Sequence, residues 1–457
     1  MNDTIAAIAT AMSPSGIGIV RISGPEAFDV IDRIYQSKSG KKKLSSAASH
    51  TIHYGYICDG EEVIDEVMVL FMKAPNTYTR EDTIEIDCHG GVFVMKRILE
   101  TVIKYGARPA EPGEFTKRAF LSGRIDLTQA ESVIDVINSK NQFALRSSLS
   151  QLKGSVLSDV REIRADLLHE IAFIESALDD PEHISLDGYT DTLTAIVGKC
   201  KARIERLLAS SDNGRILKEG INTVILGKPN AGKSSLLNIL VGEDRAIVTD
   251  IAGTTRDVLE ETISIHGISL NIMDTAGIRD TEDLVEKIGV SKAKEYASRA
   301  DLILYVIDAS TKLDQSDYEI IDLLGDRQAI VLLNKTDLDV VTTEEEVASL
   351  VKQKVVAFSA KENRGIEELE DEIKRMFFHG EVSFNDEVYI TNVRQKNSLQ
   401  ESLTSLDLVL RSIEDGMPED FYSIDLMNAY TALGSMIGES VEDDLVNEIF
   451  SKFCMGK

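Results

Sequence analysis

The sequence has few cysteines and no long apolar run, and both shortages exclude kinds of protein. Its four cysteines, Cys58, Cys88, Cys200 and Cys454, form no Cys-x-x-Cys pair. Their spacing argues against a disulfide framework and a zinc site, so we expect a protein of the reducing cytoplasm. No run of about 18 apolar residues occurs, so we expect no membrane-spanning helix. The opening MNDTIAAIATAM lacks a basic stretch before an apolar core, which predicts no secretory signal.

Positive charge is also scarce. The chain has 49 Lys and Arg against 77 Asp and Glu, a net charge of −28. Residues 1–120 are nearly balanced, with 14 cations and 16 anions, so most of the excess acid lies in the remainder. Because phosphate contacts need cations, this balance opposes simple nucleic-acid binding. Any contact with RNA should be local, or shared with a basic partner.

Residues 1–120 have the pattern of a mixed α and β domain. Short apolar runs rich in β-formers predict strands, and amphipathic runs predict helices. The expected strands are Ile5–Met12, Gly18–Ser23, Val67–Met72 and Thr83–Asp87, and the expected helices are Glu26–Tyr35 and Val92–Tyr105.

The pattern becomes helical after Gly123. Apolar residues recur every three or four positions from Ala130 to Leu178, and no proline lies between Pro112 and Pro181. A helical stripe of this length predicts a bundle of long helices.

A second helical stretch is expected at about 189–208, and the following SDNGRILKEG (211–220) looks like a linker. From Ile221 short apolar strands alternate with helices, the pattern of a parallel sheet. After about Phe378 the chain is helical again.

The α/β module therefore lies between two helical segments. They form either three domains in a row or one discontinuous helical domain with the α/β module inserted. We favour the insertion, because the C-terminal 75 or so residues make a poor core alone. The expected fold is multidomain α/β plus α: an N-terminal α+β domain, a discontinuous long-helix bundle and an inserted Ras-like P-loop G domain with a mainly parallel sheet. The expected domains are 1–120, 121–215 (the first segment of the helical domain), 216–378 (the G domain) and 379–457 (the second segment of the helical domain).

A nucleotide site is predicted by GKPNAGKS, Gly227 to Ser234, which matches G-x-x-x-x-G-K-S and lies between a strand and a helix. Its glycines let backbone N–H groups approach the phosphates. Lys233 would contact the β- and γ-phosphates, and Ser234 would hold Mg²⁺.

Three later motifs complete the site. DTAG, from Asp274, ends a strand, where the carboxylate would reach Mg²⁺ and the Gly277 N–H the γ-phosphate. NKTD ends another strand, and its Asp337 would accept from guanine N1–H and the exocyclic amine. Ser359-Ala-Lys would supply a backbone N–H to guanine O6. In addition, Thr254-Thr255 lies between the phosphate loop and DTAG, where a switch threonine should join Mg²⁺. This order is that of small GTPases.

We therefore predict that the chain binds and hydrolyses GTP. The residues assigned to GTP are Asn230, Ala231, Gly232, Lys233, Ser234, Ser235, Thr249, Asp250, Ile251, Ala252, Gly253, Thr254, Thr255, Asp274, Thr275, Ala276, Gly277, Asn334, Lys335, Asp337, Ser359, Ala360 and Lys361.

The residues alone leave two mechanistic points open. Ile278 stands where Ras-like proteins have the glutamine that orients the attacking water, so another group must act. Glu282, Asp283 and Glu286 are candidates, and each could equally be a solvated helix residue. Asn230 could ligate a monovalent cation beside the phosphates or simply form a turn.

The chain resembles the MnmE (TrmE) family of tRNA-modification GTPases along essentially its whole length. The resemblance rests on DTIAAIAT, GIGIVRISGPEA, EDTIEIDCHGG, EPGEFTKRAFLSGRIDLTQAE, GKPNAGKSSLLN, DIAGTTRD, DTAGIRDTEDLVEKIG and the terminal FCMGK. It implies a cytoplasmic homodimer that acts on tRNA with a flavoprotein, MnmG (GidA), which carries FAD. Together they would add an aminomethyl or carboxymethylaminomethyl group to C5 of the wobble uridine (U34). The one-carbon unit would come from 5,10-methylene-tetrahydrofolate, in a site that could also bind a 5-formyl analogue. GTP hydrolysis would be stimulated by K⁺.

The resemblance also assigns roles to single positions. Glu286 matches the acidic residue that positions water in the family, which resolves the choice among the three acidic candidates. Cys454 matches the cysteine that the family needs for modification. The matched folate ligands are Arg21, Glu85, Arg124 (a lysine in some relatives) and Lys457. The matched Mg²⁺ ligands are Ser234 and Thr255, and the K⁺ ligands are Asn230, Thr249, Ile251 and Thr254. The N-terminal domain would bind folate and dimerise the protein.

Two other functions compete with this one. A ribosome-assembly GTPase would share DTAGIR and the P-loop asparagine, but the sequence has no second P-loop and no GxxG-containing tail. A dynamin-like membrane GTPase is disfavoured by the acidic balance and by the lack of a basic amphipathic segment.

Overall fold

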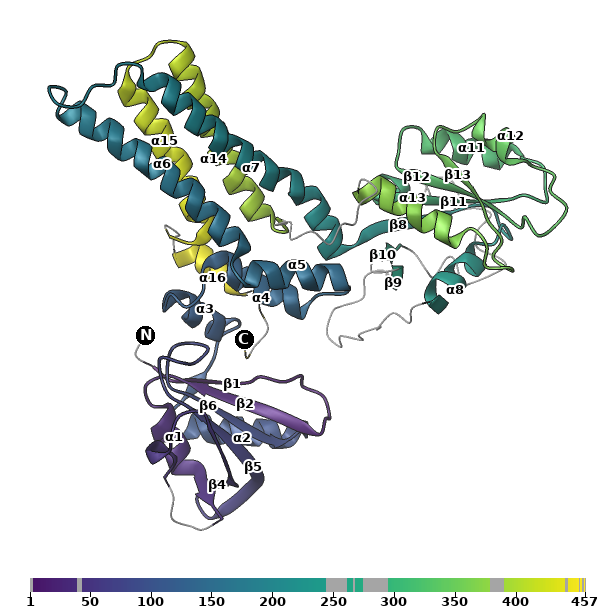
Figure 1. Ribbon diagram of the computed structural model, residues 1–457. Coiled ribbons are helices and arrows are strands. Elements are labelled where there is room, and N and C mark those ends of the chain that lie inside the picture. The colour runs from purple at the N-terminus through teal and green to yellow at the C-terminus, as the bar shows by residue number, and fades with distance from the viewer. Residues whose placement is uncertain are drawn as a thin grey trace. The chain divides into compact units, whose positions relative to one another are not determined.

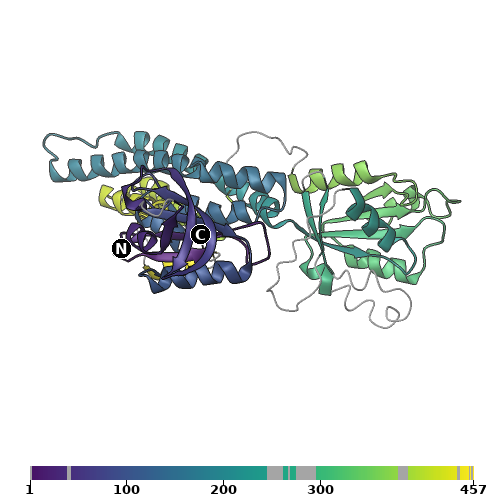
Figure 2. The same cartoon turned by 90° about the horizontal axis from the view of Figure 1, so that it is seen from below.

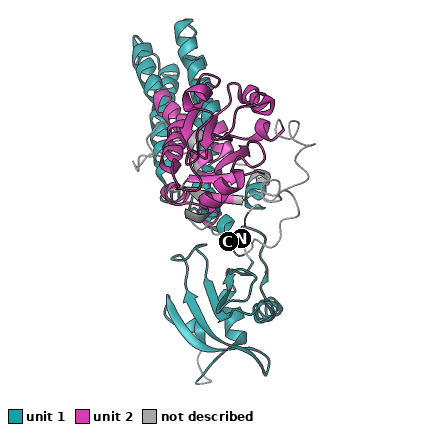
Figure 3. Ribbon diagram, turned by 90° about the vertical axis from the view of Figure 1, so that its right-hand side faces the viewer, with its two compact units in different colours: residues 1–134, 151–200, 398–457 teal, residues 135–150, 201–397 magenta. Residues whose placement is uncertain are grey.

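A computed structural model describes residues 3–38, 43–243, 261–265, 268–273, 295–378, 390–439, 443–451, 453 and 456 of the 457-residue chain. The chain forms two compact units, each made of segments distant in sequence (Figure 3). Unit 1 comprises residues 1–134, 151–200 and 398–457, and unit 2 comprises 135–150 and 201–397. In the described ranges, every helix is too short or too polar to cross a membrane. The domain boundaries expected at 120, 215 and 378 stay predictions.

Unit 1 contains a seven-stranded sheet of order β3-β4-β5-β6-β2-β1-β7. Its neighbouring strands are antiparallel except β1 and β7. The strands are β1 (Ile5–Ile8), β2 (Ile17–Ser23), β3 (Tyr35–Ser37), β4 (Thr51–Asp59), β5 (Glu62–Met72), β6 (Thr83–His89) and β7 (Arg108–Pro109). The four expected strands are confirmed as β1, β2, β5 and β6, whereas β3, β4 and β7 were not expected.

Helices α1 (Ala27–Ile34) and α2 (Val92–Lys104) pack on the same face of this sheet (Figure 1). Alternate strand residues such as Val20 and Ile86 are fully buried under them. The intervening residues therefore lie on the opposite face, because successive side chains of a strand alternate. Arg21 and Glu85 belong to this second face. A 3₁₀ turn, η1 (Leu44–Ser46), follows β3.

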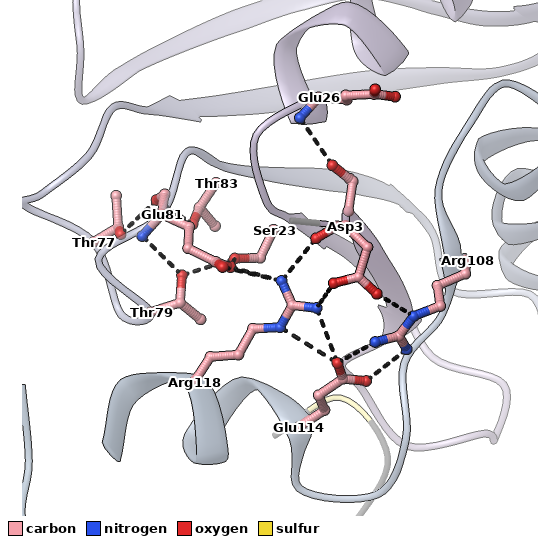
Figure 4. A network of polar contacts seen from close by, with 11 residues as sticks. Asp3, Ser23, Glu26, Thr77, Thr79, Glu81, Thr83, Arg108, Glu114 and Arg118 are labelled. Atoms are coloured by element: carbon pink, nitrogen blue, oxygen red, sulfur yellow. Dashed lines mark hydrogen bonds and ion pairs between the residues drawn. The ribbon is translucent and has the colours of Figure 1, made fainter. Parts of the chain in front are cut away.

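A buried ionic network fixes helix α3 (Glu114–Leu121) to the sheet domain (Figure 4). The guanidinium of Arg118 is fully enclosed and donates to Glu114 at 2.9 Å and to Glu81 at 3.0 Å. Arg108 donates to Glu114 at 2.8 Å and also pairs with Asp3. Since a buried ion that loses its partner is costly, these charges hold one another in place.

A further set of helices lies between α3 and the end of the chain, before and after the second sheet in sequence. They are α4 (Leu127–Ile137), α5 (Gln142–Leu152), α6 (Ser155–Asp179), α7 (Tyr189–Glu219), α14 (Val393–Glu414), α15 (Glu419–Ile437) and α16 (Asp443–Ser451). Within unit 1, α6 and α15 pack along each other although the second sheet lies between them in sequence (Figure 1). The discontinuous helical domain is therefore confirmed.

The expectation of a linker at 211–220 was wrong, because α7 continues to Glu219. The Ser, Asn and Gly of this segment are typical of loops, but tertiary packing overrides that composition. Ser211 is buried, and a Cβ on Gly214 would come within 2.3 Å of the Ile390 carbonyl oxygen. The helix ends at Gly220, whose φ of +87° is a common helix stop.

Unit 2 contains a six-stranded sheet of order β13-β12-β11-β8-β10-β9, parallel except for the pairing of β9 with β10. Its strands are β8 (Ile221–Leu226), β9 (Glu261–Ile265), β10 (Ile268–Ile272), β11 (Leu302–Asp308), β12 (Ala329–Asn334) and β13 (Lys354–Ala357). Figure 2 shows helices along both faces of this sheet. α8 (Lys233–Glu243) and α13 (Ile366–Phe378) share one apolar core, and α11 (Gln315–Leu324) and α12 (Glu344–Ala348) share the other. The mainly parallel G-domain sheet is thus confirmed.

Candidate functional site

The phosphate-binding loop joins β8 to α8, as the motif predicts. Gly227 has φ +150°, and a Cβ there would come within 2.4 Å of the Val306 carbonyl oxygen, so only glycine fits. The Nζ of Lys233 donates to the carbonyls of Gly227 at 2.8 Å and Lys228 at 2.7 Å. Burial lowers the pKa of Lys233, since it disfavours the charged form. An anionic phosphate beside this amine would favour its charged form.

Asn334 connects the phosphate loop to the base-binding motifs. It ends β12 and is almost fully buried. Its amide nitrogen donates to the Ala231 carbonyl at 2.8 Å, and its amide oxygen accepts from the Ala360 N–H at 3.1 Å. One side chain thereby joins three segments that the sequence separates. Gly232 has φ +107°, and a Cβ there would lie 2.0 Å from the same amide nitrogen, so glycine is favoured there too.

Asp337 is held ready to accept hydrogen bonds. The hydroxyl of Ser359 donates to its Oδ1 at 2.8 Å, and this bond holds the pKa of the Asp337 carboxyl below its usual 3.8. Lys361 Nζ lies 3.9 Å from Oδ2. The carboxylate is therefore ionised at neutral pH, as recognition of guanine N–H groups requires.

Three supporting ion pairs, made by two lysines, were not anticipated. Lys335, at φ +65°, binds Asp308 at the end of β11 with an Nζ–Oδ2 distance of 2.6 Å. Lys228 lies between Asp314 at 2.9 Å and Asp317 at 2.6 Å, and so ties the phosphate loop to α11. Asp308 could have been predicted near the site from its place at the end of a parallel strand, because the carboxyl ends of such strands meet at one edge of the sheet.

Many of the predicted site residues lie outside the described residues. In the GTP site these are Thr249, Asp250, Ile251, Ala252, Gly253, Thr254, Thr255, Asp274, Thr275, Ala276, Gly277 and the catalytic candidate Glu286. At the C-terminus they are Cys454 and Lys457. The contacts above bring together Ala231, Gly232, Lys233, Asn334, Asp337, Ser359 and Ala360.

A second cluster lies on the open face of the unit 1 sheet. Arg21 on β2 and Glu85 on β6 are directly opposite in register, and Arg21 Nε lies 2.7 Å from Glu85 Oε1. Arg21 Nη1 also donates to the Gly456 carbonyl at 3.2 Å. This contact brings Gly456, which is distant in sequence, beside the two positions matched to folate ligands.

Aromatic side chains complete this cluster. The Arg124 guanidinium lies 4.7 Å from the Tyr78 ring centre, and that of Arg21 lies 5.5 Å from the ring centre of Phe115. The Tyr78 hydroxyl is 3.0 Å from Thr116 Oγ1, so α3 and the ionic network behind it set the position of both rings. Arg21, Glu85 and Arg124 thus gather around flat apolar surfaces suited to a planar, charged ligand.

Asp87 is a residue of this face that sequence reasoning missed. It lies two positions after Glu85 on β6, and so on the same side of the sheet. Its Oδ1 is buried without a hydrogen-bond partner among the described residues. Burial, followed by the nearby Glu85 charge, raises the pKa of Asp87. The alternation in TIEID was the signal that could have found it.

Comparison with known proteins extends these findings to the whole chain. The MnmE helical domain model matches residues 127–454, and the model of the GTP-binding protein TrmE N-terminus matches residues 4–124. The tRNA modification GTPase MnmE of Lachnoclostridium phytofermentans is 61% identical over 100% of this chain and 99% of its own. That of Acetivibrio thermocellus is 49% identical, with the same coverage.

Among solved structures, the G domain of the T. maritima FeoB iron transporter is 27% identical over 34% of this chain and 96% of that chain, with a TM-score of 0.25. The assignment therefore rests on the matches along the sequence and on the site described above. On both grounds the chain belongs to the MnmE (TrmE) family of tRNA-modification GTPases.

Proposed function

We propose that this GTPase works with the flavoprotein MnmG (GidA) to add an aminomethyl or carboxymethylaminomethyl group to C5 of the wobble uridine of certain tRNAs. The observation that carries the proposal is the joining of the phosphate loop to both base-binding motifs through Asn334, in a chain that matches the MnmE (TrmE) family from end to end. Hydrolysis of GTP would drive a conformational change that the helical domain relays, in a protein of the cytoplasm.

The chain's own groups account for nucleotide recognition. Lys233, already oriented by two loop carbonyls, would exchange them for the β- and γ-phosphate oxygens. Asp337 would accept from guanine N1–H and the exocyclic amine, and the Ala360–Lys361 backbone would donate to O6. Adenine offers neither this pair of donors nor that acceptor, so the site would select GTP.

Hydrolysis requires a water positioned in line with the γ-phosphorus. The new P–O bond forms as the bond to the β–γ bridging oxygen breaks, which releases GDP and phosphate. We assign the positioning of this water to Glu286. Mg²⁺ would be held by Ser234 and Thr255. K⁺ would be held by Asn230 with Thr249, Ile251 and Thr254, and both ions would stabilise charge that develops on the phosphates.

The cluster on the N-terminal sheet would bind the tetrahydrofolate one-carbon donor. Glu85 can accept from the amino-pyrimidine edge of a pterin, while Arg21, Arg124 and Lys457 can pair with the glutamyl carboxylates. Because Arg21 and Glu85 bind each other at 2.7 Å, the ligand must share or replace that pair. We assign Cys454 to modification. We also propose that the N-terminal domain forms a homodimer through the open sheet face, where Ile17, Tyr54 and Met68 are exposed.

Mass spectrometry of nucleosides from bulk tRNA, with and without the gene, tests this function. We expect the C5-substituted wobble uridines to disappear and to return with the wild-type gene but not with Cys454→Ser. Cys454→Ser should still hydrolyse GTP at the wild-type rate, and an equal loss of GTPase would make that cysteine structural. An unchanged nucleoside profile would favour the alternative of a ribosome-assembly GTPase.

A further inference from the structure

The last part of the helical domain has acidic residues but no basic residues in its sequence. Residues 412–451 include ten Asp and Glu and no Lys, Arg or His. Helix α15 occupies the middle of this stretch and packs against α6 in the bundle (Figure 1). Arg164 of α6 pairs with Glu439 and lies 4.0 Å from the Tyr430 ring centre, so among the described residues the unpaired acid gathers around the start of α15. A region with an excess of one charge sign repels ligands of that sign and attracts those of the other.

One side of α15 is apolar and exposed. Tyr422, Leu426 and other residues of its opposite side are buried. Phe421, Ile424 and Met427 are 45%, 57% and 44% exposed, and their spacing of three places them on one side of the helix. We name these three residues the α15 strip. Single exposed apolar residues are ordinary, but a group of large ones on one helix marks an interaction surface.

Acidic side chains border the α15 strip. Asp420 lies next to Phe421 and is exposed, and Asp425 follows Ile424. Glu414 and Asp415, both exposed, precede the helix. An apolar centre with a charged rim is the usual anatomy of a protein interface. The sign of the rim specifies a partner surface with Lys or Arg around an apolar centre.

We propose that the α15 strip binds a partner protein whose contact surface is apolar at its centre and basic at its rim, and that this partner is the flavoprotein subunit of the modification complex. The inference rests on the proposed function. Charge argues against two other occupants, because tRNA phosphates would face the acidic rim, and a second copy of the strip would place acid against acid.

The apolar contribution is tested with the full-length chain and the purified flavoprotein by isothermal titration calorimetry. The variant carries Phe421→Ser, Ile424→Ser and Met427→Ser together. Because these side chains are exposed, the variant should fold and keep its basal GTPase rate. The matched control carries Leu168→Ser and Leu178→Ser, two exposed apolar residues of α6. We expect the Kd for the flavoprotein to rise at least about tenfold in the variant and less than about twofold in the control.

The acidic rim is tested by charge reversal. Wild-type affinity should fall as salt rises, since salt screens opposite charges. Glu414→Lys with Asp420→Lys should weaken binding at low salt and flatten this dependence, whereas Asp191→Lys on α7 should leave it unchanged.

The outcomes separate this inference from the proposed function. If the flavoprotein binds the wild type and both sets of variants equally well, the α15 strip is not its docking surface, and the proposed function stands. If the flavoprotein does not bind the wild type, the proposed partner is wrong and this assignment falls with it. If the strip variant loses affinity for tRNA, or self-association in sedimentation velocity, while it still binds the flavoprotein normally, another occupant replaces the one proposed.

Discussion

The amide of Asn334 donates a 2.8 Å hydrogen bond to the backbone carbonyl of Ala231, 103 residues earlier in the chain. This bond, with the one from the Ala360 N–H, makes the phosphate loop and the guanine motifs one rigid site. A nucleotide would then meet donors and acceptors already fixed at the correct spacing, so little entropy is lost when it binds.

Asn334→Ala should weaken nucleotide binding although the residue need not touch the base. The buried carbonyl of Ala231 and the half-buried N–H of Ala360 would lose their partners, and an unsatisfied buried group costs about 1–3 kcal/mol. We expect the Kd for a fluorescent GTP analogue to rise about tenfold or more. Gln353→Ala is the control, because the Gln353 amide also donates to backbone carbonyls. Gln353 precedes β13 and so lies at the amino ends of the parallel strands, away from the predicted site. Equal effects of the two variants would contradict the role of Asn334.

Asn230→Gly should remove the difference between K⁺ and Na⁺ in GTPase rate. Asn230 has φ +62°, where alanine is strained and glycine is not, so this variant removes the side chain and keeps the loop. We expect the wild type to run faster in KCl than in NaCl and the variant to run equally slowly in both. Asn363→Gly, at φ +54°, is the matched control. A variant that still prefers K⁺ would show that Asn230 only forms the turn.

Arg21→Ala should weaken folate binding without changing the GTPase rate. Its guanidinium forms charged hydrogen bonds, each worth about 1.5–3 kcal/mol, so titration with 5-formyl-tetrahydrofolate should show at least about tenfold lower affinity. Arg97→Ala provides a control on α2, which packs on the other face of the sheet. Unchanged affinity in Arg21→Ala would place the folate elsewhere.

Glu114→Gln should reduce the acid sensitivity of unit 1. Burial would raise the pKa of Glu114, but hydrogen bonds from Arg108, Glu111 N–H and Arg118 outweigh it and hold the pKa below 4.5. A carboxyl with a lowered folded pKa stabilises the fold above its unfolded pKa, and this contribution is lost as pH falls through the folded value.

We therefore expect the wild type to lose stability as pH falls below about 4.5, by calorimetric unfolding. Glu114→Gln should start about 3–5 kcal/mol less stable at pH 7 and lose less on acidification. Glu111→Gln, which changes an exposed carboxyl three residues away, should follow the wild-type profile. A variant as acid-sensitive as the wild type would assign the effect to other carboxyls.

Asp135→Asn should uncouple GTP hydrolysis from tRNA modification. Asp135 is buried, lies 2.7 Å from Lys218 at the end of α7, and accepts from Thr391 just before α14. It therefore joins segments through which the chain enters and leaves the G domain. We expect normal basal GTPase and a severalfold slower modification rate, with a similar effect for Lys218→Met and no further loss in the double variant. Asp166→Asn, which breaks a more exposed pair with Lys199, should change neither rate.

Sequence patterns predicted those parts of the fold that depend only on consecutive residues. The phosphate loop was predictable because its glycines, strand and helix are consecutive. The helical state of 211–220 was not, because it depends on the distant Ile390, against which Gly214 packs. In the cluster on the open face of the unit 1 sheet, Arg21 and Glu85 came from family resemblance. Asp87 was missed although the strand alternation places it on the same face.

The ionic network around Arg118 is a second feature that the sequence pattern could not predict. GEFTKRA helped to identify the family, yet nothing in its letters shows that Arg118 meets Glu81, 37 residues away. Contacts of this kind depend on how strands and helices are placed in space, which no periodicity records. The same is true of the bond between Asn334 and Ala231.

The pairing of α6 with α15 sets an order of events on the ribosome. About 240 residues separate the end of α6 at Asp179 from the start of α15 at Glu419. At about 5–20 residues per second, the apolar side of α6 waits roughly 12–48 s for its partner helix to be made. The G domain, which is complete before α15 emerges, can fold during this interval. A chaperone that shields α6 from other apolar chains would thus act in a defined window of synthesis.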